Sequence, residues 1–247
     1  MEKIAVALSK GGVGKTTSAV NLAAGLARAG KIVLLVEVDT QGQVARALGC
    51  SPPMGLAELV ANEASPEQVL FQARANLWLL SGGRSLVGLK RVITRKDFGG
   101  EQTISEALSV LDGRFDYAIL DTGPGWDSLT VNVLFYATRI VAPVSLEVMT
   151  LQGLMEFSRS LQTIQKYREE LELRYVVPTF YDRRVKKSGE ILTQLQNYFG
   201  DRLCTPIRYN VRLSEAPGFG QTIFEYAPNS GGAEDYQTLT ERILGDG

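Results

Sequence analysis

The sequence predicts a single α/β domain built on one doubly wound, mostly parallel sheet with helices on both faces. Short apolar segments alternate with longer helical patterns along the whole chain, as in folds whose helices cover a parallel sheet. Most of these segments are continuous runs rich in Val, Ile and Leu, typical of strands buried on both faces. The first segment leads directly into a glycine-rich loop and a helix. No linker interrupts the pattern, so residues 1–247 are expected to form one domain.

The individual elements follow from these patterns. The predicted strands are residues 4–8, 32–36, 77–80, 117–121, 139–144, 175–178 and a short segment at 204–207. The predicted helices are residues 16–29, which stop at Gly30, then 151–172, 189–199 and 233–244. Residues 83–103 have weak periodicity and a cationic run that is typical of solvated surface.

The composition excludes several kinds of active site. The 247 residues include no histidine, which removes Ser-His-Asp triads and His-ligated zinc. Cys50 and Cys204 have no CxxC spacing, which excludes an iron–sulfur cluster or a four-cysteine zinc site within one chain. No apolar run approaches the roughly 20 residues that cross a bilayer, and the N-terminus has no leader pattern. We therefore expect a cytoplasmic protein without membrane contact.

The charge is distributed unevenly, although the net charge is only −1. Residues 174–212 contain eight arginines and lysines against three acidic residues. Such asymmetry indicates an anionic partner for this region, since Lys and Arg neutralise the phosphates in sequence-independent DNA binding. The candidate DNA-binding residues are Arg183, Arg184, Lys186, Lys187, Arg208 and Arg212.

The loop after the first predicted strand, SKGGVGKTT at residues 9–17, has the form of a phosphate-binding loop. Glycines let such a loop curl so that its amides face phosphate oxygens, and the following helix adds its positive dipole end. Lys15 is expected to bridge the β- and γ-phosphates, Thr16 to ligate Mg²⁺, and Thr17 to reach the α-phosphate. The remaining nucleotide-binding candidates in the loop are Lys10, Gly11, Gly12, Val13 and Gly14.

Two acidic motifs complete the expected site. Asp39 follows a buried strand and is the candidate for orienting the attacking water, because ligands of open α/β sheets collect at the carboxyl ends of the strands. Asp121 ends four apolar residues, as in a Walker B motif, and is expected to hold Mg²⁺ through a coordinated water. Glu37 is a further magnesium candidate.

Lys10 makes the loop motif more specific for one group of proteins, since KGGVGKTT resembles the loop of deviant Walker A ATPases. The segment VEVDTQG resembles the LLVDxDPQG motif of that group, with Glu37 for Asp, Thr40 for Pro and Gln43 for Asn. The motif DTGP replaces DxPP and places Gly123 where the family has proline. With NVRLSEAPGFG at residues 210–220, the resemblance extends over nearly the whole chain and is to the ParA/Soj family of partition ATPases.

This resemblance implies a slow, partner-stimulated ATPase that uses ATP and Mg²⁺. It implies a homodimer formed with ATP, in which Lys10 contacts the nucleotide of the other subunit and so takes part in catalysis with Lys15 and Asp39. The dimer would bind double-stranded DNA without sequence preference, associate with the nucleoid, and respond to a ParB-type adaptor protein in chromosome or plasmid partition. Thr179, Pro206 and Ile207 would flank the adenine.

Three other interpretations stay open. A ParA relative that positions a protein cargo on the nucleoid would have the same ATPase and DNA-binding parts. A MinD-like membrane ATPase needs a basic amphipathic helix at its C-terminus, and residues 241–247 do not show that pattern. A nucleotide switch without hydrolysis is disfavoured by the presence of both Asp39 and Asp121.

Overall fold

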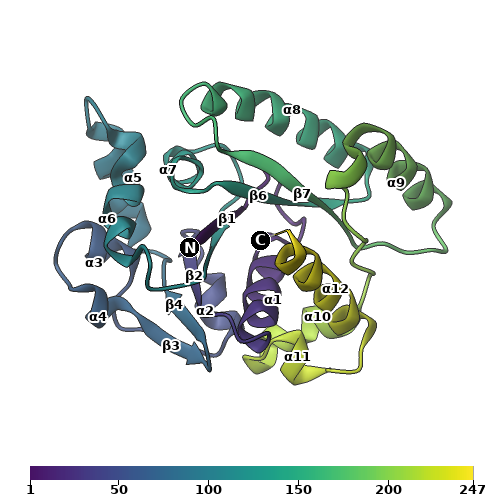
Figure 1. The fold of residues 1–247 in the computed structure, drawn as a ribbon, viewed down its shortest axis with the longest axis horizontal. Coiled ribbons are helices and arrows are strands. Elements are labelled where there is room, and N and C mark those ends of the chain that lie inside the picture. Colours follow the sequence, from purple (N-terminus) through teal and green to yellow (C-terminus); the bar gives the residue numbers. More distant parts are fainter. Residues whose placement is uncertain (247) are drawn as a thin grey trace.

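The computed structural model describes residues 1–246, and within them seven strands form one sheet (Figure 1). The strands are β1 (Glu2–Val6), β2 (Val33–Val38), β3 (Phe71–Arg74), β4 (Leu77–Leu80), β5 (Tyr117–Thr122), β6 (Arg139–Ser145) and β7 (Glu172–Thr179). Their order across the sheet is β3-β4-β2-β5-β1-β6-β7. All neighbours are parallel except the antiparallel pair of β3 and β4. The predicted doubly wound, mostly parallel sheet is confirmed.

Helices cover both faces of this sheet (Figure 1). The α-helices are α1 (Lys15–Arg28), α2 (Gln43–Ala47), α3 (Leu56–Val60), α4 (Pro66–Val69), α5 (Leu86–Arg95), α6 (Thr103–Leu108), α7 (Ser128–Tyr136), α8 (Val148–Gln165), α9 (Lys186–Phe199), α10 (Val211–Glu215), α11 (Ile223–Tyr226) and α12 (Gly231–Gly245). Short 3₁₀ helices are η1 (Gly100–Gln102), η2 (Ser109–Leu111), η3 (Gly200–Arg202) and η4 (Ala216–Phe219). Among the described residues, no helix is both long enough and apolar enough to cross a membrane.

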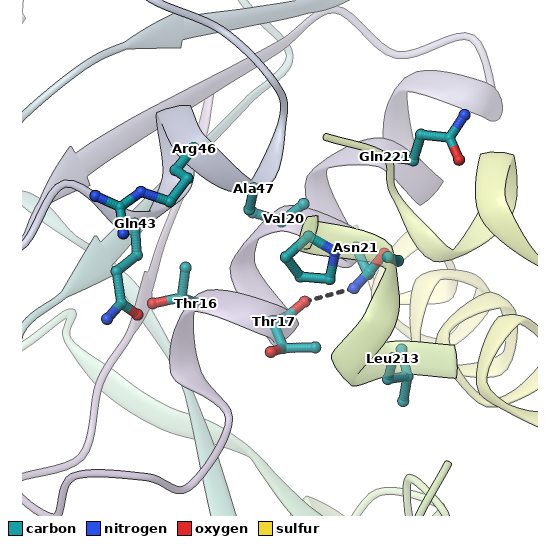
Figure 2. Close-up of a pocket in the computed structure, with 11 residues that line it drawn as sticks. Thr16, Thr17, Val20, Asn21, Gln43, Arg46, Ala47, Leu213 and Gln221 are labelled. Atoms are coloured by element: carbon teal, nitrogen blue, oxygen red, sulfur yellow. Dashed lines mark hydrogen bonds between the residues drawn. The ribbon is translucent and has the colours of Figure 1, made fainter. Parts of the chain in front are cut away.

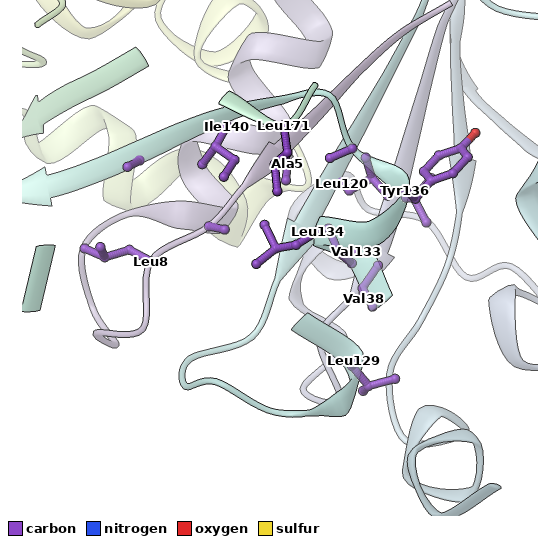
Figure 3. Packing of buried hydrophobic residues seen from close by; sticks show 14 of the residues in the cluster. Ala5, Leu8, Val38, Leu120, Leu129, Val133, Leu134, Tyr136, Ile140 and Leu171 are labelled. Atoms are coloured by element: carbon purple, nitrogen blue, oxygen red, sulfur yellow. The ribbon is translucent and has the colours of Figure 1, made fainter. Parts of the chain in front are cut away.

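The core is divided by the sheet into two layers, because successive strand residues point to opposite faces. Ile4 and Val6 of β1 pack with α1, α11 and α12 on one face. Ala5, between them, packs on the other face with α7 and α8, where Leu134 and Ile140 lie close to it (Figure 3). The strands are therefore buried on both sides, which holds the loops at their carboxyl ends in fixed positions.

The strand predicted at residues 204–207 is wrong. This segment runs beside β7 and makes separate backbone bonds. Cys204 N donates to Val176 O (2.9 Å), Ile207 N donates to Pro178 O (2.8 Å), and Tyr181 N, just after β7, donates to Ile207 O (3.1 Å). Pro206 has no N–H group to donate between them, so a continuous ladder does not form. The segment still lies close enough to β7 to contribute to the site at the strand ends.

Two other expectations also differ from the structure. The helix predicted to reach residue 172 ends at Gln165, and β7 begins at Glu172 after a turn in which the Gln165 amide donates to Leu171 O (2.7 Å). Strand β3 was not predicted, and α5 forms within residues 83–103, where no element was expected. Strand β3 lies at the edge of the sheet, whereas α5 packs against α3 and α7.

A contact between two glycines joins α2 to the segment after α10. Gly49 and Gly220 both have left-handed backbones, with φ of +65° and +66°. A Cβ atom built on Gly220 would lie only 2.8 Å from the Cα of Gly49, so the two backbones touch where neither has a side chain. The Arg74 guanidinium donates to Gly220 O (2.9 Å) and pairs with Glu225 (2.5 Å), which fixes β3 to the same place.

Candidate active site

The loop between β1 and α1 has the backbone geometry of an anion site. Gly12 and Gly14 have φ of +73° and +88°, which glycine adopts without strain. Gly14 stands at the N-cap of the 14-residue helix α1 and supplies no side-chain cap, so the amides of the first turn are not bonded by a capping side chain. Uncapped amides and the positive end of the helix dipole favour a bound phosphate.

Lys15 is buried at the centre of this loop. Its ammonium donates to the carbonyl oxygen of Lys10 (2.8 Å), which closes the loop upon itself. Burial lowers the pKa of the Lys15 ammonium, while the nearby charges of Asp121 and Asp39 act in the opposite direction. A buried cation between carboxylates is well placed to stabilise an additional anionic ligand.

Thr16 and Asp121 meet beneath the loop. The Thr16 hydroxyl donates to Oδ2 of Asp121 (2.9 Å), and Asp121 is completely buried at the end of β5. Within residues 1–246, Oδ1 of Asp121 has no hydrogen-bond partner. Burial raises the pKa of the Asp121 carboxyl to about 8, and the carboxylates of Asp39 and Glu37 add to this effect.

This pair fits a magnesium ion better than a purely structural role. A buried carboxylate oxygen without a partner is costly, and a divalent cation removes that cost. The described residues contain no cluster of three or more His, Cys, Asp or Glu side chains able to hold a metal ion. Magnesium at phosphate-transfer sites needs no such cluster, because water and phosphate oxygens complete its octahedron.

Asp39 lies just beyond β2, beside the segment that follows β5. It is nearly buried, and its Oδ1 accepts a hydrogen bond from the Gln41 amide (3.0 Å). A Cβ on Gly123 would stand 3.2 Å from this same oxygen, so the absence of a side chain at Gly123 leaves room for the observed position of Asp39. The DTGP sequence therefore has a steric consequence at the predicted water-orienting carboxylate.

Glu37 has a role that the sequence did not indicate. Its Oε1 accepts from the Val44 amide at the start of α2 (2.6 Å), and its Oε2 accepts from the Gly82 amide after β4 (3.0 Å). Burial raises the pKa of this carboxyl, although both backbone bonds favour its ionised form. Glu37 thus ties two loops to β2, and its function as a magnesium ligand stays a prediction.

Shortening Glu37 to aspartate, the residue of the family motif, is expected to destabilise the protein. A side chain one methylene shorter cannot reach both the Val44 and Gly82 amides, and one buried amide is left unpaired. The expected loss is about 1–3 kcal/mol of unfolding free energy, measured by urea denaturation. Glu37→Gln keeps the length but has only one accepting oxygen, so it is expected to lose stability as well, because its NH2 group faces one of the two amides. Equal stability of Glu37→Asp and wild type would contradict the anchoring role.

Lys10 lies on the opposite side of the loop from Lys15. Its ammonium donates to the hydroxyl of Thr150 (2.7 Å) and pairs with Glu147 (3.3 Å), both at the start of α8. The structure therefore brings Lys10 to the rim of the predicted site but holds it within its own chain. These contacts span 137 and 140 residues of sequence and had no local signal.

Two cavities flank Thr17. One, of about 140 Å³, lies between the loop, the end of β7 and α10, and its lining includes Gly14, Thr179, Phe180, Ile207 and Tyr209. The Thr179 hydroxyl donates to Val13 O (3.0 Å) and fixes this wall to the loop. The predicted adenine residues Thr179 and Ile207 border this cavity, whereas Pro206 is not among the residues that line it.

The second cavity, of about 200 Å³, lies on the side of α1 that faces α2 (Figure 2). Thr16 and Thr17 form its base, Arg46 borders it from α2, and Leu213 borders it from α10. The Asn21 amide donates to Thr17 O (2.8 Å) beneath the cavity. Thr17 and Leu213 line both cavities, so α10 forms a partition beside the N-terminal end of α1.

The predicted DNA-binding residues differ in how they are held. Arg183, Arg184, Lys186 and Lys187 are exposed on the β7–α9 loop and the first turn of α9. Arg184 pairs with Asp182 (2.7 Å), and Lys187 pairs with Glu190 (3.4 Å). Exposed pairs of this kind contribute little stability, so these cations can exchange a carboxylate for a phosphate.

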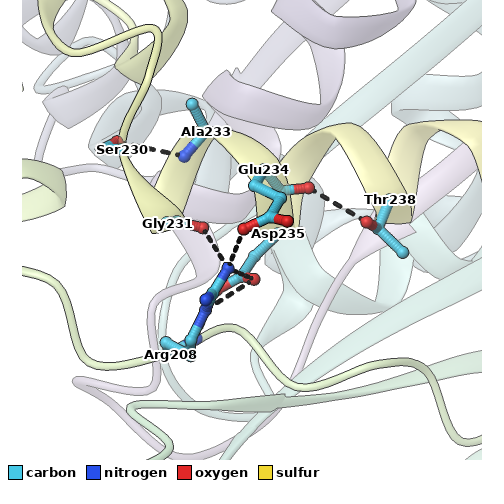
Figure 4. Close-up of polar contacts among 7 residues, drawn as sticks. All are labelled: Arg208, Ser230, Gly231, Ala233, Glu234, Asp235 and Thr238. Atoms are coloured by element: carbon cyan, nitrogen blue, oxygen red, sulfur yellow. Dashed lines mark hydrogen bonds and ion pairs between the residues drawn. The ribbon is translucent and has the colours of Figure 1, made fainter.

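Arg212 and Arg208 lie on or just before α10 but have different environments. Arg212 is exposed and pairs with Glu215 (2.9 Å). Arg208 makes a two-oxygen contact with the buried carboxylate of Asp235 and a further pair with Glu234, both at 2.6 Å (Figure 4). These carboxylates raise the pKa of the Arg208 guanidinium. Arg208 therefore holds the first turn of α12 against the segment after residue 204, a role the sequence did not predict.

Comparisons with known proteins agree with this geometry. A family model described as an AAA domain matches residues 1–173. The chromosome-partitioning ATPase Soj of Thermus thermophilus is 38% identical, over 99% of this chain and 96% of that protein. The sporulation initiation inhibitor protein Soj of Bacillus subtilis is 33% identical, over 99% of this chain and 98% of that protein.

Solved structures share the fold over almost the full length. Cobyrinic acid a,c-diamide synthase from Mycobacterium smegmatis, with bound ATP analogue and magnesium, has a TM-score of 0.84 and 28% identity, over 99% of this chain and 94% of that one. The cell division ATPase MinD of Pyrococcus furiosus has a TM-score of 0.83 and 22% identity, over 100% of this chain and 99% of that one. The length and identity of the Soj matches, together with the site geometry, show that this chain belongs to the Soj/ParA family of partition ATPases.

Proposed function

We propose that the protein is an ATPase that dimerises with ATP, binds double-stranded DNA without sequence preference in that state, and works with a ParB-type adaptor protein in DNA partition. The observation that carries the proposal is the convergence of Lys15, Thr16 and Asp121 with Asp39 at one edge of the sheet, with Lys10 at its rim. The residues match what phosphoryl transfer to water requires.

Each side chain has a distinct task in hydrolysis. Lys15 and the amides of the α1 N-terminus bind the β- and γ-phosphates, and the Thr17 hydroxyl reaches the α-phosphate. Thr16 and Asp121 would hold Mg²⁺, which would neutralise charge on the phosphate oxygens. Asp39 orients the attacking water, since its second carboxylate oxygen is not used by the Gln41 amide.

The surface around Lys10 supports dimerisation through this face. Trp126 and Met149 are exposed apolar side chains. Met149 lies in the first turn of α8 beside Thr150, and the Trp126 ring packs edge-on against Phe157 of the same helix (5.4 Å between ring centroids). The Gly125 amide donates to Ser9 O (2.8 Å), which fixes the Trp126 segment to the start of the loop. Exposed apolar groups around a charged centre are common at protein interfaces, and here a second copy of the chain would cover them.

The exposed cations of the β7–α9 loop and α10 support DNA binding. A single set of such cations binds DNA weakly, whereas two sets joined in one dimer act together at high effective concentration. This makes DNA binding depend on ATP without any new contact. A relative that positions a protein cargo would share these features, and the identity of the adaptor distinguishes the two functions.

Binding to mixed-sequence double-stranded DNA with ATP, with ADP and without nucleotide tests the proposal. We expect binding only with ATP, its loss in Lys10→Ala, its retention in Asp39→Ala, and a weakening of about tenfold in Arg212→Ala, because each dimer loses two phosphate contacts. Raising the salt concentration should weaken wild-type binding more steeply than binding by Arg212→Ala. Binding that is absent in every nucleotide state would overturn the DNA function and favour a protein- or membrane-directed one.

A further inference from the structure

The cavity between α1 and α2 contains a single charged side chain. Of the residues that line this cavity of about 200 Å³, all within the described part of the chain, Arg46 alone carries a charge (Figure 2). Its guanidinium is exposed and forms no ion pair and no hydrogen bond with residues 1–246. A cavity whose only charge is an unpaired cation attracts an anionic occupant.

The polar groups at the base of this cavity differ in how they are used. Asn21 is buried and both ends of its amide are bonded, since it donates to Thr17 O (2.8 Å) and accepts from the Ile223 amide (2.8 Å). The Thr16 hydroxyl donates to Asp121 (2.9 Å). The Thr17 hydroxyl makes no hydrogen bond within residues 1–246, so it can bind a ligand together with Arg46.

Helix α2 fixes the backbone of Arg46 and leaves its side chain free. At the start of the helix, the Val44 amide donates to the Glu37 carboxylate (2.6 Å). Just after the helix, the backbone of Gly49 touches that of Gly220. The guanidinium therefore enters the cavity from an anchored position, and its planar N–H groups match two oxygens of one phosphate.

We propose that Arg46 is a nucleotide-binding residue whose guanidinium contacts the α-phosphate from the side of α2. The inference rests on the proposed function, in which Thr17 reaches that phosphate. Thr17 lines both cavities, and the other cavity is bordered by the predicted adenine residues Thr179 and Ile207. A phosphate at Thr17 thus has the base on one side and Arg46 on the other. Lys15 acts farther along the nucleotide, on the β- and γ-phosphates.

Calorimetric affinities for AMP, ADP and ATP with magnesium test this assignment. Arg46→Ala should weaken all three by about tenfold, because each nucleotide has an α-phosphate and loses one charge-assisted contact. Lys15→Ala should weaken ADP and ATP far more than AMP. Arg46→Lys keeps the charge but not the planar group, and should weaken binding by only about threefold. Arg91→Ala, which removes an exposed cation of α5 outside this cavity, should match wild type.

Two further measurements separate binding from a structural role of Arg46. Guanidinium ions at millimolar concentration should restore part of the affinity of Arg46→Ala and leave wild type unchanged. The melting temperature of Arg46→Ala without nucleotide should equal that of wild type, because the side chain makes no ion pair or hydrogen bond within residues 1–246. A large fall in melting temperature without guanidinium rescue would overturn the assignment.

The remaining outcomes distinguish this inference from the function on which it rests. Arg46→Ala that binds all three nucleotides like wild type, or that loses affinity for ATP alone, overturns the α-phosphate contact. If inorganic phosphate raises the melting temperature of ADP-saturated wild type but not of ADP-saturated Arg46→Ala, the cavity holds a free phosphate and the assignment is equally overturned. Wild type that binds no nucleotide, or Lys15→Ala that binds ATP like wild type, overturns the proposed function itself.

Discussion

Replacing Asp121 by asparagine is expected to make the protein more stable and inactive at once. Asp121 is completely buried and leaves Oδ1 without a partner among the described residues, and burial raises its pKa to about 8. The ionised carboxylate is thus disfavoured in the folded chain. Asparagine keeps the shape and can still accept from Thr16, but it removes the buried charge.

Without nucleotide, Asp121→Asn is expected to melt about 5 °C above wild type. This shift corresponds to a gain of roughly 2 kcal/mol in unfolding free energy for a chain of this size. ATP hydrolysis should fall by about a hundredfold or more, because the magnesium ion loses its protein carboxylate. Thermal unfolding and a phosphate-release assay check the two effects. An asparagine variant that is both less stable and still active would show that Asp121 has a structural role only.

Arg208→Ala is expected to lower the stability of the protein, whereas Arg212→Ala is expected to weaken DNA binding, although the two arginines are only four residues apart. Removing the Arg208 guanidinium leaves the buried Asp235 carboxylate with only the backbone amide of residue 208, at 2.8 Å. Loss of one partner of a buried charge is strongly destabilising, and the remaining amide reduces the expected cost to about 2–3 kcal/mol. The melting temperature should fall by about 5–10 °C.

Arg212→Ala provides the contrast. Its pair with Glu215 is exposed, so the expected change in unfolding free energy is below about 0.5 kcal/mol. It should nevertheless bind DNA less tightly. Thermal unfolding of both variants and wild type measures the effect on stability, and DNA binding at a temperature where both variants are folded measures the effect on binding. Equal melting temperatures for the two variants would contradict the stabilising contact of Arg208 with Asp235.

The grouping of the candidate nucleotide-site residues was predictable because its signals are local in sequence. The glycines and Lys15 of residues 9–17 directly precede α1, and Asp39 and Asp121 each follow an apolar strand, so the topology brings them to one edge. The strands at the centre of the sheet were found within a few residues for the same reason. Strand β3 is short, only partly buried and at the sheet edge, and its sequence shows no comparable pattern.

Contacts between distant segments were not predictable. Lys10 contacts Glu147 and Thr150, which lie 137 and 140 positions away in sequence, and neither residue belongs to a recognisable motif. Arg208 looked like one more cation of a basic region, because nothing near it in sequence shows that Asp235 lies beside it. The expected strand at 204–207 failed at Pro206, whose missing N–H outweighs the apolar character of its neighbours.

The contact between Gly49 and Gly220 also limits how the molecule can move. The first glycine follows the helix that begins after the Asp39 loop, and the second follows the segment that carries Arg212. With backbone against backbone there is no side chain to bend or rotate, so a shift at one glycine displaces the other. The contact thus couples the segment of Asp39, the proposed water-orienting carboxylate, to the segment of Arg212, a proposed DNA-binding residue.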